Sequence, residues 1–144
     1  METVKEIKQQ FMAFRNGIVA DTLRKAGLPF SIIFGLQLPQ IRLIAQEVAQ
    51  RYQDKTTLKK IASELIDDHN IRESRILGFV LMPPEKLTFE EATGLCSGIL
   101  SREEADLLPF LLLRKTAFIP QILKDNRFGG KHADYLKETL IRFL

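Results

Sequence analysis

Apolar residues recur every three or four positions along almost the whole chain, and this spacing restricts the fold more than any other feature. Stripes of this period run through residues 3–15, 57–66 and 71–82. The stripe that begins at residue 38 consists of Leu38, Ile41, Ile44, Ala45 and Val48. A period of three to four is typical of helices with one buried face, and no segment shows the sustained two-residue alternation of a strand. The sequence therefore predicts an all-α protein.

Several short motifs predict where these helices begin and end. Gly27 is a natural helix stop, and the two prolines after Met82 cannot continue a helix. Thr88 is followed three residues later by Glu91, and Ser101 by Glu104. This spacing is that of a capping box at a helix N-terminus. About ten short helices joined by short loops are expected.

The length of 144 residues favours one domain over residues 1–144. Short loops favour antiparallel neighbours, so we expect stacked helix pairs, and the helix lengths suggest a solenoid, although the sequence shows no fixed repeat. Gly129 and Gly130 mark a joint before a last apolar stripe in residues 131–144. This segment is expected to cap the open end of the stack. The alternative is a homodimer formed through this C-terminal helix.

Composition excludes several classes of protein. Cys96 is the only cysteine, and no apolar run reaches membrane-spanning length, so we expect a cytoplasmic protein without a membrane partner. His69 and His132 have no partners at ligand spacing, and there is no glycine-rich phosphate loop, so neither a metal nor a cofactor is expected. The net charge of +3 permits a polyanion partner, and residues 107–132 are the most basic stretch.

The stretch FGLQLPQIRLIAQ, residues 34–46, is an unusual start for a helix. Gly35 can adopt a positive φ and Pro39 fits the first helical turn, so the segment is predicted to be a rigid corner. Arg42 lies near the positive end of the helix dipole, where a cation is unfavourable. It is either solvated or paired with a carboxylate such as Glu47, or it is aimed at a phosphate.

Two blocks of the chain resemble the DNA alkylation repair family, the AlkD-type DNA glycosylases. The block FGLQLPQIRLIAQEVA resembles the family's YGV-x-x-P-x-(L/I)R-x-(L/I)A motif, and IRESRILGFVLMPP resembles its arginine-rich RE-x-R-x-L helix. The resemblance covers residues 1 to about 125. It implies a curved HEAT-like solenoid whose basic concave face follows the phosphates of duplex DNA.

The resemblance implies a set of phosphate-binding residues and one catalytic residue. The basic positions are Arg42, Arg72, Arg75, Arg114 and Lys115. Arg72 and Arg75 are spaced to share a helix face and to bracket successive phosphates, or else they belong to a network with Glu73 or with Asp67 and Asp68. The family's catalytic aspartate corresponds to Asp106, for which the alternative is a helix acid near an N-terminus.

The active site of the family is the part that this chain matches least. The chain has no tryptophan, and Arg102 stands where the family has an aromatic wall. Phe110 or Phe118 would have to supply the π-face that receives a cationic base. The sequence therefore favours a DNA-binding HEAT-like protein with weak or no base excision. The alternatives are a protein-interaction scaffold and an active alkylpurine DNA glycosylase.

Overall fold

The computed structural model describes residues 2–144. Regular structure in this range consists of nine α-helices and two short 3₁₀ turns, which confirms the all-α prediction. Extended segments pair within it only at one parallel bridge, between Ile32 and Ile71. The chain forms two compact units, unit 1 (Met1–Met82) and unit 2 (Pro83–Leu144). No helix of residues 2–144 combines the length and the apolar character needed to cross a bilayer.

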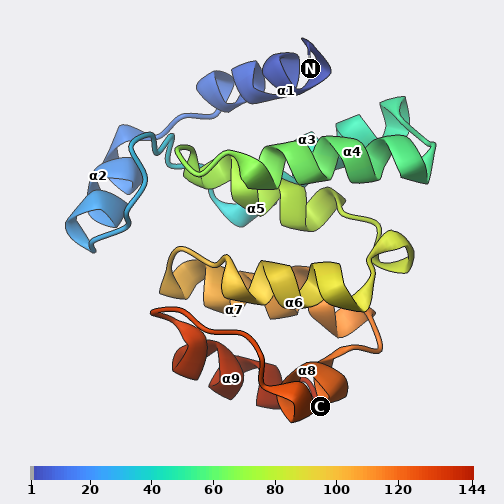
Figure 1. Ribbon diagram of the computed structural model, residues 1–144. Coiled ribbons are helices and arrows are strands. Elements are labelled where there is room, and N and C mark those ends of the chain that lie inside the picture. The colour runs from blue at the N-terminus through green and yellow to red at the C-terminus, as the bar shows by residue number, and fades with distance from the viewer. Residues whose placement is uncertain (1) are drawn as a thin grey trace. The chain divides into compact units, whose positions relative to one another are not determined.

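Unit 1 is built around its last helix. Its elements are α1 (Glu2–Ala13), α2 (Gly17–Lys25), α3 (Leu38–Arg51), α4 (Lys55–Asp67) and α5 (Arg72–Leu81). Helix α5 packs against α3 and α4, and α1 packs against the same two helices (Figure 1). The fully buried side chains include Phe11, Ile41, Ile44, Ile61, Leu65 and Leu77. These are the apolar positions of the helical stripes, so the periodicity of the sequence predicted the core.

The corner before α3 has Gly35 and Pro39 in the conformations that the sequence predicted. Pro39 lies in the first turn of α3, and the Gln37 N–H donates a hydrogen bond to Gln40 Oε1 at 2.9 Å. Gly35 has a φ of +84°, and a Cβ at this position would lie 2.1 Å from the carbonyl oxygen of Asn16. Only glycine allows this close approach of two backbone segments, which places the start of α2 beside the corner.

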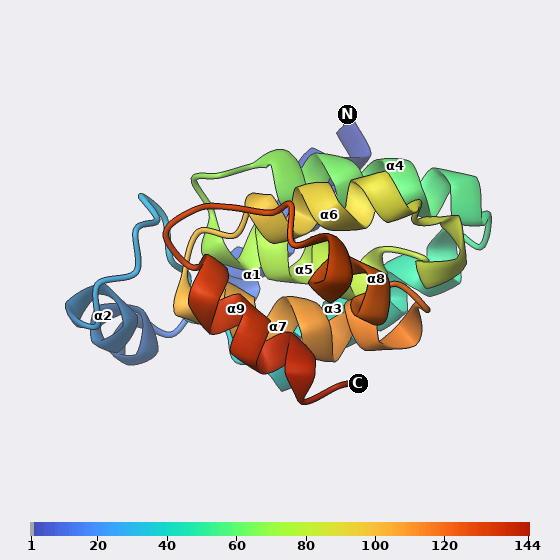
Figure 2. The same cartoon turned by 60° about the horizontal axis from the view of Figure 1, so that its bottom comes forward.

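Unit 2 contains η1 (Pro84–Lys86), α6 (Phe89–Ser97), α7 (Arg102–Leu111), η2 (Leu113–Lys115), α8 (Ile119–Asp125) and α9 (Ala133–Ile141). Helix α9 packs against α6, α7 and α8, and it lies across α7 in Figure 2. Leu136 and Leu140 of α9 are fully buried, whereas Ile141 and Leu144 are 57% and 70% exposed. The C-terminal segment therefore supplies part of the core of unit 2.

The two predicted capping boxes differ in the structure. At α6 the Glu91 N–H donates to Thr88 Oγ1 at 3.1 Å, and the Thr88 N–H donates to Glu91 Oε1 at 2.9 Å. At α7 the Glu104 N–H donates to Ser101 Oγ at 3.1 Å, but Glu104 Oε1 accepts from the Leu100 N–H instead of from Ser101. The carboxylate reaches one residue further back, so the second box is only half formed.

Candidate nucleic-acid interface

Arg72 and Arg75 belong to α5, the most buried helix of unit 1, and the two residues are only 6% and 3% exposed. Arg72 Nη1 donates to the Leu36 carbonyl at 2.8 Å and to Glu73 Oε2 at 2.7 Å. Arg75 Nη1 donates to the Ile66 carbonyl at 2.6 Å. The expectation that this pair brackets successive phosphates does not fit these positions, whereas the alternative pairing of Arg72 with Glu73 is confirmed.

Glu73 is the centre of a polar cluster inside unit 1. Its side chain is fully buried, and its two oxygens accept hydrogen bonds from the Phe34 and Gly35 N–H groups, both at 3.0 Å. With Arg72 as a third donor, the carboxylate is compensated as a buried charge requires. The cluster attaches the corner at residues 34–36 to the first turn of α5. The only sequence signal for it was an acid beside an arginine at the start of a largely apolar helix.

Arg42 is exposed on α3. Together with other residues of α3 and α5 it lines a hollow of about 280 Å³ in unit 1. Glu47, the carboxylate suggested as its partner, lies 3.5 Å from Arg51 one turn further along α3. The Arg42 side chain is therefore exposed on α3 and also has an interaction within the chain.

Arg114 and Lys115 are adjacent exposed cations at the end of η2 in unit 2. Arg114 Nε donates to the Phe110 carbonyl. Its guanidinium carbon also lies 5.0 Å from the centroid of the Phe110 ring, which is a cation–π contact. Neither cation forms a salt bridge with any residue that the structure describes. The two side chains form an exposed basic pair, hereafter the Arg114–Lys115 pair.

Arg127, from the same basic stretch of sequence, is in a different environment. Its Nη2 lies 3.2 Å from both Glu90 and Asp125, and the hydrogen bond to Glu90 is the main reason that its pKa is raised. Two acids therefore neutralise this cation. The basic character that the sequence shows for residues 107–132 is reduced here and retained at the Arg114–Lys115 pair.

Asp106, the candidate catalytic carboxylate, is engaged by the last helix. The Tyr135 hydroxyl of α9 donates to its two oxygens at 3.0 and 3.2 Å, and this bond raises the pKa of Tyr135. The Arg102 guanidinium carbon lies 4.9 Å from the Tyr135 ring centroid, so Arg102 packs on an aromatic face of its own unit. Phe118 packs edge-on against Phe89 at 5.8 Å. In this arrangement Asp106 connects α7 to α9.

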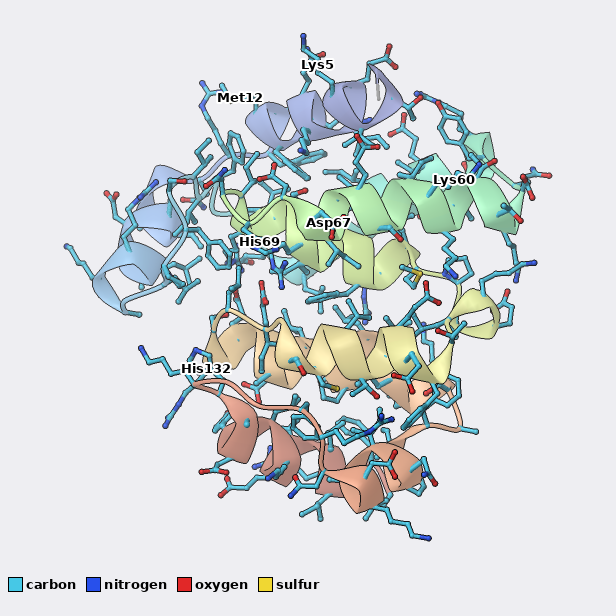
Figure 3. All side chains as sticks on the ribbon, in the orientation of Figure 1. Lys5, Met12, Lys60, Asp67, His69 and His132 are labelled. Atoms are coloured by element: carbon cyan, nitrogen blue, oxygen red, sulfur yellow. The ribbon has the colours of Figure 1, made fainter. Side chains whose placement is uncertain are left out.

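The remaining candidate residues give no sign of chemistry. Cys96 is fully buried, and burial raises the pKa of its thiol to about 12, so it behaves as a small apolar side chain. His69 is exposed in unit 1 and His132 is half-buried in unit 2 (Figure 3). Over residues 2–144, no group of three or more His, Cys, Asp or Glu side chains is arranged to hold a metal ion.

Comparison with known proteins finds no family model, no curated protein and no solved structure that matches this chain. The resemblance of residues 34–49 and 71–84 to the alkylation repair family stays a prediction.

Proposed function

We propose that this chain is a HEAT-like helical protein that binds duplex DNA through the phosphate backbone and does not excise bases. The observation that supports this most is the Arg114–Lys115 pair, because two adjacent cations are exposed and neither forms a salt bridge with a described residue. Arg42, in the block that resembles the family motif, is a further exposed cation. Helices α4 and α5, which pack together across the short link of residues 68–71, suit a repeat of helix pairs.

The contacts of Arg114 make it suitable for a phosphate. Its Nε is held by the Phe110 carbonyl and its plane is supported by the Phe110 ring, so part of the side-chain entropy is already lost before binding. A guanidinium bonds a phosphate through two parallel N–H groups, and Lys115 adds a second charge beside it. Such contacts give affinity that is independent of sequence and decreases as salt rises.

Three features support binding without excision. Asp106 accepts the hydrogen bond of Tyr135, so a substrate would have to compete with α9 for this carboxylate. Arg102 places a positive charge over the ring of Tyr135, the residue that binds Asp106, and this charge disfavours a cationic alkylated base. The chain also has no tryptophan to form the aromatic wall that the resemblance implies.

Fluorescence anisotropy with a labelled duplex tests the proposal. We expect wild-type affinity to fall steeply between about 50 and about 200 mM salt. The double variant Arg114→Gln/Lys115→Gln should bind more weakly at low salt, and its slope of log K against log salt should be shallower by about two. The matched control is Lys124→Gln/Arg127→Gln, which removes the same charge from the same unit and should change the slope less than the first double variant, because Arg127 is already paired with Glu90 and Asp125.

Absence of duplex binding by the wild type at low salt would exclude the proposal. Equal slopes of log K against log salt for the two double variants would exclude Arg114 and Lys115 as the phosphate-binding residues. The protein-interaction scaffold would then become the preferred function. Exposed apolar side chains favour it as the second candidate, since Ile18 and Leu43 in unit 1 are 81% and 57% exposed and Leu144 in unit 2 is 70% exposed. Exposed apolar side chains bind a protein partner or a second copy where they gather into one contiguous patch.

A further inference from the structure

The Arg114 guanidinium is fixed on one side by its own unit. Its Nε donates to the Phe110 carbonyl, and its central carbon lies 5.0 Å from the centroid of the Phe110 ring. Phe110 belongs to α7 and is 38% exposed, so this contact lies at the surface of unit 2. A backbone acceptor and an aromatic ring therefore hold the guanidinium in place before any ligand arrives.

The other side of the same guanidinium is open to a ligand. Arg114 is exposed, and within residues 2–144 its two Nη groups donate to no acceptor and pair with no acid. A guanidinium is flat and carries its N–H donors around its edge, so the edge and the face can bind different groups. The Nη edge suits a phosphate, and the outer face suits a flat π-system.

These two surfaces and the neighbouring lysine restrict the ligand. A nucleotide joins a phosphate to a flat base, and bases stack on arginine planes as they do on aromatic rings. Lys115 is also exposed and supplies a second cation, which favours a strand with successive phosphates over a free nucleotide. Inside a duplex both faces of a base are covered by its neighbours, so only an unpaired base can reach the guanidinium.

We propose that Arg114 receives an unpaired base of a nucleic-acid strand on its outer face, while its Nη groups and Lys115 bind the neighbouring phosphates. The inference rests on the proposed function and specifies the form of nucleic acid that this site prefers. The platform is the guanidinium and not the ring, because Phe110 already has contacts within the chain. Every base has a π-face, so the site should show little sequence preference.

Anisotropy with two labelled single strands tests the inference: an oligothymidylate and an abasic strand with the same number of phosphates. We expect the wild type to bind the thymine strand at least about fivefold more tightly at low salt. Arg114→Lys keeps the charge and loses the plane, so this ratio should fall to about one, while the salt slope for a duplex stays unchanged. Lys115→Gln is the control, because it removes a phosphate contact that both strands share and should leave the ratio as it is.

Equal affinity of the wild type for the two strands, or an undiminished ratio in Arg114→Lys, would overturn the inference. Salt-dependent binding to the duplex would in either case still support the proposed function, so the two failures are distinguishable. If neither the strands nor the duplex bind at low salt, both proposals are excluded. A ratio that falls in Lys115→Gln as far as in Arg114→Lys would show that the base preference depends on charge and not on the flat guanidinium, and it would also overturn the inference.

Discussion

Substitution of Gly35 by alanine is the most informative perturbation of the fold, because the added Cβ atom has two separate effects. The first is backbone strain, since Gly35 has a φ of +84°. An L-residue in the left-handed region costs about 1–2 kcal/mol. The second is a collision, because the new Cβ would lie 2.1 Å from the Asn16 carbonyl oxygen and 2.9 Å from the Ala20 nitrogen. Both are backbone atoms of the start of α2, so the corner itself has to move.

Movement of the corner also disturbs the buried carboxylate. The Gly35 N–H donates to Glu73 Oε2 at 3.0 Å, and a hydrogen bond to a charged group contributes about 1.5–3 kcal/mol. Strain and the loss of this bond together predict that Gly35→Ala lowers the free energy of unfolding by about 3–5 kcal/mol. A urea slope of about 2 kcal/mol/M would convert this loss into a midpoint shift of about 2 M.

Two further glycines separate the contributions. Gly27 has a φ of +91° but no atom within 4 Å of an added Cβ, so Gly27→Ala should cost only the strain of about 1–2 kcal/mol. Gly94, inside α6, has open space and no positive φ, so Gly94→Ala should stabilise the protein by about 0.5–1 kcal/mol. Urea unfolding followed by circular dichroism measures all three variants. A cost at Gly35 no greater than that at Gly27 would refute the close approach of the corner to α2.

Two other predictions concern charge and pH. Glu73→Gln removes the buried negative charge that pairs with Arg72 and should cost about 3–5 kcal/mol, whereas the same change at the exposed Glu47 should cost less than about 1 kcal/mol in urea unfolding. Similar costs for the two variants would contradict the buried cluster. The bond to Asp106 raises the pKa of Tyr135 above its ordinary value of 10.0, so its contribution to stability is present below that pH and is lost as pH rises through the folded pKa. Unfolding midpoints measured above pH ~10 should therefore fall more steeply with pH in the wild type than in Tyr135→Phe. Parallel curves of midpoint against pH would count against the hydrogen bond between Tyr135 and Asp106.

Local patterns predicted those parts of the fold that depend on nearby residues. Helical periodicity located the core, as at Ile41 and Leu65, because the same face of a helix is buried along its whole length. The capping box at Thr88 was also predictable, since both of its partners lie within one turn. Gly35 was recognised as a turn residue, but its contact with Asn16 was not, because the sequence does not state which backbone approaches it.

The candidate site was predicted less well, because burial of a charged side chain depends on distant partners. The spacing of Arg72 and Arg75 was compatible with a phosphate-binding face. Nothing in the neighbouring sequence shows that the two guanidinium groups donate to the carbonyls of Leu36 and Ile66. Asp106 and Tyr135 are likewise 29 residues apart, and their hydrogen bond results from the packing of α9 on α7. A positive charge in a sequence therefore indicates a binding surface only when its burial is known.

Net charge alone does not support DNA binding by this protein. Unit 1 has twelve Lys and Arg against nine Asp and Glu, whereas unit 2 has nine of each. The small excess in unit 1 includes Arg72 and Arg75, which are buried, so the long-range field that attracts a polyanion is weak. Affinity must then come from local contacts, and the Arg114–Lys115 pair lies in the unit without excess charge. For this reason the comparison of two double variants with equal charge loss is decisive: a field effect predicts the same salt slope for both, and contacts at the pair predict different slopes.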